Sequence, residues 1–115
     1  MEVHSITDVE AELLNDISDD VYGLWEVDWF FNGRFPEWEL DQRIDLLSSI
    51  VKRGLIDVFF GRTGTDLTPL PPNAALNAVR NPTNWQPREP LEEPVLHVMT
   101  SNAGSNALRA YMTND

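Results

Sequence analysis

The stretch from residue 36 to residue 60, PEWELDQRIDLLSSIVKRGLIDVFF, decides the fold because its hydrophobic period changes partway along. In the first part, apolar residues recur every three or four positions, which is typical of an amphipathic helix. Pro36 suits the first helical position and Gly54 suits its end. Residues 55–60 are mostly β-branched or aromatic and predict a strand. The predicted core face of the helix consists of Leu40, Ile44, Leu47 and Val51.

Two further helices are predicted before this stretch. Thr7 and Glu10 have the spacing of a capping box, in which each side chain accepts a hydrogen bond from the other residue's backbone amide. Apolar residues at i, i+4 and i+8 follow, so a helix should begin here. The second helix is predicted over residues 21–31. Asn32 and Gly33 should end it, because glycine readily adopts the left-handed conformation that follows many helices.

Four segments complete the chain after the predicted strand. Residues 73–80 predict a short helix. Residues 81–94 contain four prolines and should form an extended surface connection, with Trp85 as its only anchor. Residues 95–99 predict a second strand, and residues 102–112 predict a closing helix.

This order of elements resembles a winged helix-turn-helix domain. Two junctions carry the resemblance: residues 52–56 (KRGLI), where a helix passes through glycine into a strand, and residues 97–104 (HVMTSNAG), where a strand enters the last helix. The resemblance implies an α+β, mainly helical fold with three N-terminal helices, a two-stranded sheet and a C-terminal helix. The wing would be enlarged to about 33 residues and would contain a short helix. The whole chain, residues 1–115, would form a single domain.

The composition indicates one ordinary domain in the cytoplasm. A chain of 115 residues can bury one core without covalent staples. It has no cysteine, which excludes disulfides and thiolate metal sites. The N-terminus lacks the features of a signal peptide, and no apolar run is long enough to cross a membrane.

Charge is the most unusual global property. Nineteen acidic residues face eight basic ones, which gives a net charge of −11. Such a field repels phosphate and anionic lipid and attracts basic partners, although it also serves solubility alone. Winged helices usually bind DNA through the third helix and basic residues. This chain has Glu37, Glu39, Asp41 and Asp45 there, so direct nucleic-acid binding is not expected.

Aromatic residues are concentrated between residues 22 and 38, where seven of the chain's eleven lie. They could all fill the core. However, a three-helix core does not easily enclose seven large rings, and exposed tryptophans are common interface anchors. We expect at least one tryptophan of this region to be exposed, with Trp38 the first candidate and Trp25 the second. The predicted partner-binding residues are Tyr22, Trp25, Glu26, Trp29, Glu37, Trp38 and Glu39.

The sequence contains no recognisable catalytic, metal or cofactor motif. His4 lies near the N-terminus and His97 in a predicted strand, where it is expected to be a strand residue rather than a ligand. Residues 16–20 lack the pattern of a calcium loop. No serine lies in a nucleophile-elbow motif, and residues 61–65 lack the lysine of a phosphate-binding loop. The chain is therefore not expected to be an enzyme.

These observations favour an acidic protein-interaction module on a winged-helix-like scaffold. It would bind a protein partner, for instance a basic one, or a second copy of itself as a homodimer. An inhibitor or immunity-type protein that occupies a basic, nucleic-acid-binding surface is one form of this hypothesis, because dispersed carboxylates can imitate phosphates. The alternative is a DNA-binding transcription regulator of the winged-helix class.

Overall fold

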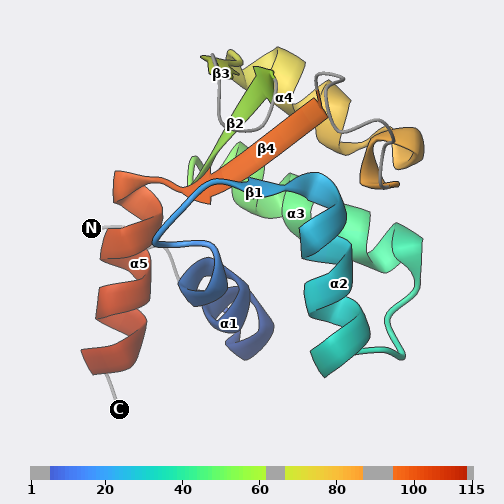
Figure 1. Ribbon diagram of the computed structural model, residues 1–115. Coiled ribbons are helices and arrows are strands. Elements are labelled where there is room, and N and C mark those ends of the chain that lie inside the picture. The colour runs from blue at the N-terminus through green and yellow to red at the C-terminus, as the bar shows by residue number, and fades with distance from the viewer. Residues whose placement is uncertain (1–5, 62–66, 87–94, 114–115) are drawn as a thin grey trace.

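The computed structural model describes residues 6–61, 67–86 and 95–113 (Figure 1). Helices and strands are interspersed along this part of the chain. In order, they are α1 (Asp8–Asp16), β1 (Tyr22–Gly23), α2 (Leu24–Arg34), α3 (Leu40–Lys52), β2 (Ile56–Gly61), β3 (Leu67–Pro69), α4 (Pro72–Val79), the 3₁₀ helix η1 (Pro82–Trp85), β4 (Val95–Thr100) and α5 (Asn102–Thr113).

The four strands form one antiparallel sheet in the order β1-β4-β2-β3. Strand β4 lies between β1 and β2, although it is the last of the four strands along the chain. Its Val98 is the Cα partner of Tyr22 on one side and of Val58 on the other. The register of β2 with β4 runs from Ile56 opposite Thr100 to Gly61 opposite Val95. The last strand thus joins the two halves of the sheet.

The predicted fold, with a two-stranded sheet and three N-terminal helices, is wrong. A strand, β1, separates α1 from α2, so the chain does not begin with three consecutive helices. Strand β3 adds a fourth strand on the other edge of the sheet. Both extra strands are only two or three residues long. Strands of that length carry no detectable alternation of hydrophobicity. Nothing in the described residues confirms the resemblance to a winged helix.

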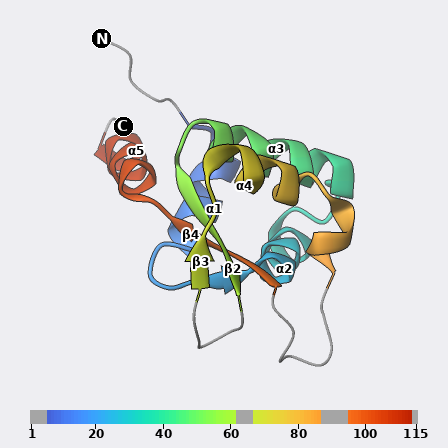
Figure 2. The ribbon, with the colours of Figure 1, turned by 90° about the horizontal axis from the view of Figure 1, so that it is seen from above.

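The helices pack around the sheet in neighbouring pairs. Figure 1 shows α1, α2 and α5 below the strands, and Figure 2 shows α3 and α4 side by side. The core between these elements contains the fully buried side chains Trp85, Phe31, Leu13, Leu14, Ile17, Leu24, Leu47, Ile50, Leu55, Val27, Val79 and Val98. Trp85, the predicted anchor of its connection, also donates from Nε1 to the Val79 carbonyl at 2.8 Å. Residues 87–94 of that connection lie outside the described residues.

The predicted capping box of α1 is confirmed. Thr7 Oγ1 accepts from the Glu10 amide at 3.2 Å, and Glu10 Oε1 accepts from the Thr7 amide at 2.9 Å. The second carboxylate oxygen of Glu10 pairs with Arg53, the residue that caps the end of α3. Glu10 is buried, so one side chain both begins α1 and ties it to α3.

Helices α2 and α3 have different bounds from those predicted. Asn32 and Gly33 lie inside α2, which continues to Arg34. Helix α3 begins at Leu40 rather than Pro36, because Gln42 Oε1 accepts from the Glu39 amide at 2.8 Å and caps the helix there. Leu40 therefore lies at the helix end and is 37% exposed, whereas Ile44, Leu47 and Val51 are buried as predicted.

The junction of β4 with α5 is held by hydroxyl groups. Thr100 Oγ1 donates to the Leu14 carbonyl at 2.7 Å, and Ser101 Oγ donates to the Gly54 carbonyl at 2.6 Å. Gly104 of α5 faces the core, and a Cβ at this position would lie 2.0 Å from the Leu55 carbonyl oxygen. Glycine thus allows α5 to approach the start of β2 closely.

Candidate partner-binding surface

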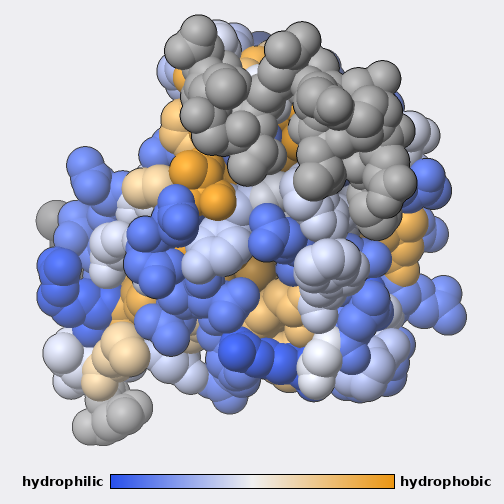
Figure 3. Space-filling view, in the orientation of Figure 1, coloured by the Kyte–Doolittle hydropathy of each residue, from blue (hydrophilic) through white to orange (hydrophobic). Residues whose placement is uncertain are grey.

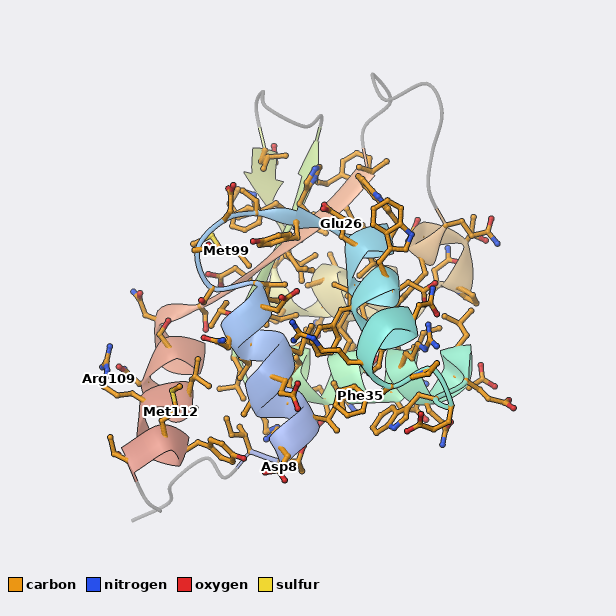
Figure 4. The ribbon with its side chains drawn as sticks, turned by 60° about the horizontal axis from the view of Figure 1, so that its bottom comes forward. Asp8, Glu26, Phe35, Met99, Arg109 and Met112 are labelled. Atoms are coloured by element: carbon orange, nitrogen blue, oxygen red, sulfur yellow. The ribbon has the colours of Figure 1, made fainter. Side chains whose placement is uncertain are left out.

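The seven predicted partner-binding residues fall into two separate groups. Tyr22 belongs to β1, and three more lie in the first two turns of α2. The other three precede α3. Figure 4 shows Glu26 at the β1 end of α2 and Phe35 beyond its opposite end. The first group is Tyr22, Trp25, Glu26 and Trp29, and the second is Glu37, Trp38 and Glu39.

Most of the first group lines an open hollow of about 360 Å³ between the end of α1 and the outer face of α2. Positions 26, 29, 30 and 33 share one face of α2 because they are spaced by three or four residues. We call this feature the α1–α2 hollow. Its lining residues are Asp16, Ile17, Tyr22, Glu26, Trp29, Phe30, Gly33 and Arg34.

Trp29 is the most exposed aromatic side chain of the hollow, at 58%. Its neighbour Phe30 also lines the hollow but is buried. Among the described residues, no stacked ring or cation is recorded against the Trp29 indole. The prediction that a tryptophan between residues 25 and 38 is exposed in the single chain is confirmed, although by neither of the two residues named first.

Trp38 is half-buried because it folds back on the core. Its ring stacks on Phe31 with centroids 5.5 Å apart and lies 6.4 Å from Phe35. The Trp38 amide donates to the Phe35 carbonyl at 3.0 Å, which closes a turn just before α3 begins. Neither Trp38 nor the exposed Glu37 and Glu39 line the α1–α2 hollow.

Trp25 is also half-buried, against the backbone of β1. A Cβ added to Gly23 would lie 2.0 Å from the Trp25 ring, so the ring lies directly over this glycine. Glu26 Oε1 accepts from the Gly23 amide at 2.8 Å and caps α2. The strand-to-helix turn therefore orients both side chains.

Tyr22 completes this side of the hollow as a neutral hydrogen-bonding group. Its hydroxyl donates to Asp19 Oδ1 at 2.8 Å. This hydrogen bond, together with burial and the nearby charges of Asp19, Asp16 and Asp20, raises the pKa of Tyr22 to about 12. The phenol is thus protonated at physiological pH, and its oxygen can still accept a hydrogen bond.

Arg34 lies against the hollow from the end of α2. Its guanidinium carbon is 4.9 Å from the centre of the Phe30 ring. Its Nη1 and Nη2 atoms lie 3.8 Å from Glu12 Oε1 and 3.6 Å from Asp16 Oδ1. These side chains are about half exposed, so the ion pairs add little stability. The Arg34 guanidinium is nevertheless in contact with both an aromatic ring and two carboxylates.

A second, smaller groove of about 280 Å³ lies between α1 and α5. The sequence reasoning did not predict it, because it depends on the packing of helices that are far apart in the chain. Figure 4 shows Asp8 of α1 and Met112 of α5, which both line it. The Tyr111 hydroxyl donates to the Asp8 carboxylate across it. The remaining lining residues are Ala11, Glu12, Asn15 and Leu108.

The described residues contain no group of three or more histidine, cysteine, aspartate or glutamate side chains that could hold a metal ion. His97 is buried on β4, with Nδ1 3.2 Å from the Val95 carbonyl oxygen. Loss of hydration lowers its pKa below the ordinary value. His4 and residues 62–65 lie outside the described ranges.

In the parts of the chain that the structure describes, no helix has the length and apolar character needed to cross a bilayer. A cytoplasmic location stays a prediction. No known protein family, curated protein or solved structure matches this chain.

Proposed function

We propose that this chain is a non-catalytic, acidic protein-interaction module that binds a protein partner through the α1–α2 hollow. The observation that carries the proposal is the 58% exposed indole of Trp29 at the edge of an open concavity. Tryptophan is among the residues most enriched at the energetic centres of protein interfaces. A side chain of this size is normally buried, so its exposure needs a reason.

The charge distribution supports a protein partner that is itself basic. The net charge is −11. Figure 3 shows hydrophilic residues surrounding small hydrophobic patches on the face in view. Within the described residues, four arginines are already paired with carboxylates of the same chain. They are Arg34, Arg43, Arg53 and Arg80.

The exposed face of α3 argues against the alternative of a DNA-binding regulator. Asp41 and Asp45 are exposed on this helix, and Asp45 Oδ1 lies 3.7 Å from Arg80 Nη1. Arg43, the one arginine of α3, is buried and pairs with Asp28. Several exposed cations on one surface are needed to neutralise phosphates.

The proposal is tested by quantitative pull-down from cells of the source organism, with the wild-type chain compared with Trp29→Ser. A specific partner should be depleted by about tenfold or more, as expected for an interface anchor, and should bind the purified wild-type chain. Phe60→Ser is the matched control, because Phe60 is also an exposed aromatic at 45% but lies on β2, outside the hollow. Equal recovery of every protein with both variants would contradict the proposal.

Two further measurements separate the other hypotheses. Sedimentation of the purified chain tests self-association, and we expect a monomer whose state does not change in Trp29→Ser. Gel retardation of a random DNA duplex at about 0.15 M salt tests the regulator, and we expect no shift. Retardation that weakens steeply with salt would favour the regulator instead.

A further inference from the structure

We propose that the α1–α2 hollow recognises an arginine of a basic segment on the partner, with the guanidinium against the Trp29 indole. This inference rests on the proposed function and names the chemistry of the partner. Glu26 and Asp16, which line the same hollow, would balance the charge. The ring face and the carboxylates would act together on one side chain.

The chain itself uses this combination twice on α2. Arg34 lies 4.9 Å from the centre of the Phe30 ring and near two carboxylates of α1. The guanidinium carbon of Arg43 lies 5.4 Å from the centre of the Phe31 ring, and its Nη1 is 2.7 Å from Asp28 Oδ1. Aromatic residues therefore stand at three consecutive positions, 29 to 31, and two of them already hold an arginine.

Trp29 is the third of these aromatic residues, and no cation of the described residues lies over its ring. Tryptophan has the most favourable ring for cation–π contact. Guanidinium is also weakly hydrated and stacks on aromatic faces more readily than ammonium does. The vacant ring face thus fits arginine better than lysine.

The polar groups that line the hollow complement a cation. The lining contains two carboxylates, Asp16 and Glu26, and one cation, Arg34. The ion pair between Arg34 and Asp16 is long, at 3.6 Å. The Tyr22 hydroxyl donates a hydrogen bond to Asp19, so its oxygen can still accept a hydrogen bond from a partner. A guanidinium has five N–H donors in a planar fork and can use several of these acceptors at once.

The hollow also has room for a long side chain. Its volume of about 360 Å³ is at the lower end of the range of about 300–1,000 Å³ for ligand pockets. Gly33 contributes no side chain to its wall, and a Cβ there would meet no atom within 4 Å. One long side chain of a partner therefore fits this space.

A second copy of the chain is a poorer occupant than a basic partner. Each copy carries a charge of −11, so two copies repel each other at long range. Of the five arginines in the described ranges, four pair with carboxylates of their own chain and are poorly placed to enter a neighbour's hollow. Charge complementarity selects a separate, basic protein.

The test uses three short helical peptides on an alanine–glutamine background, with a row of arginine, lysine or citrulline on one face. Citrulline keeps the shape of arginine and removes its charge. Binding to the purified full chain is measured by calorimetry at low salt and by NMR of the indole N–H groups. We expect the arginine peptide to bind most tightly and to shift the Trp29 indole signal, and the citrulline peptide not to bind.

Two variants locate the binding. Trp29→Ala should weaken the arginine peptide by about tenfold or more. Gly33→Leu should have a similar effect by filling the hollow, and the open space at this position means that the fold should accept it. Phe60→Ala is the control and should leave binding unchanged.

The outcomes also separate this inference from the proposed function. If Trp29→Ala loses the cellular partner but binds the arginine peptide like the wild type, the interaction module stands and the arginine assignment is wrong. Equal affinity for the arginine and lysine peptides would likewise overturn the assignment, because diffuse attraction does not distinguish the two cations. If neither the partner nor the peptide depends on Trp29, both proposals fail.

Discussion

Asp28 and Arg43 form an ion pair between α2 and α3, with Oδ1 and Nη1 2.7 Å apart and the arginine side chain only 8% exposed. The same Nη1 donates to Asn32 Oδ1 at 2.8 Å, and Nε donates to the Trp38 carbonyl at 2.8 Å. One side chain therefore fixes the angle between the two helices and the loop that joins them. This cation serves the fold and does not face an external phosphate.

Replacing Arg43 by methionine should lower the free energy of unfolding by about 2–3 kcal/mol. The range for removing one partner of a fully buried pair is about 3–5 kcal/mol, and Asp28 is 30% exposed, so part of the loss is recovered by water. Urea denaturation measures the change. Arg80→Met is the matched control. Its pair with Asp45 is 3.7 Å long and largely exposed, so we expect a loss below about 0.5 kcal/mol. Similar losses for both variants would contradict the role assigned to Arg43.

Leu47→Ala should cost about 2–5 kcal/mol, the usual range for a large-to-small change in a core. Leu47 is fully buried on α3. Leu40→Ala changes the same residue type on the same helix, but at a position that is 37% exposed, and should cost less than about 1 kcal/mol. Denaturation curves of the two variants give the comparison. A small loss for Leu47 would mean that the core face of α3 is misplaced.

Alanine should have opposite effects at two helical glycines. Gly33→Ala should stabilise the chain by about 0.5–1 kcal/mol, because a Cβ meets open space there and the unfolded chain loses conformational freedom. Gly104→Ala should destabilise it by about 2 kcal/mol or more, because the new Cβ would lie 2.0 Å from the Leu55 carbonyl oxygen. Thermal unfolding distinguishes the two. A stabilising change at Gly104 would show that α5 does not pack closely on the start of β2.

His97 should make the stability of the chain depend on pH near neutrality. Desolvation lowers its pKa in the folded state, so the unfolded chain binds a proton more readily. Its contribution is fully present above the unfolded pKa of about 6.5 and is lost as the pH falls below that value. Urea denaturation between about pH 8 and pH 5.5 should therefore show a steeper fall for the wild type than for His97→Gln. Parallel curves for the two proteins would mean that His97 titrates as it does in water.

Local signals in the sequence predicted local structure well. Thr7 and Glu10 form the predicted capping box, because its hydrogen bonds join residues only three positions apart. The buried stripe of Ile44, Leu47 and Val51 was likewise readable from its helical spacing. The ends of α2 and α3 were less predictable. At α3, Gln42 accepts from the Glu39 amide, and this cap competes with Pro36 for the start of the helix.

The candidate surface was only partly predictable. Tyr22, Glu26 and Trp29 line the hollow as a group, but hydropathy does not show which of three consecutive aromatic residues faces outward. Trp38 was assigned to a helix that begins later, and its stacking on Phe31 is a tertiary contact. Asp16 and Gly33 were missed for the same reason: α1 must pack beside α2 before they share a site.

The position of β4 sets the order in which the chain can be completed during synthesis. Residues 95–100 are synthesised after the other three described strands, yet in the sheet they pair with both β1 and β2. The hydrogen bond from the Thr100 hydroxyl to the Leu14 carbonyl also cannot form until Thr100, 86 residues later, has been synthesised. Until then, the nascent chain presents unpaired strand edges, which are templates for association with other chains. A product that stops before residue 95 cannot close its sheet, and quality control should remove it rapidly.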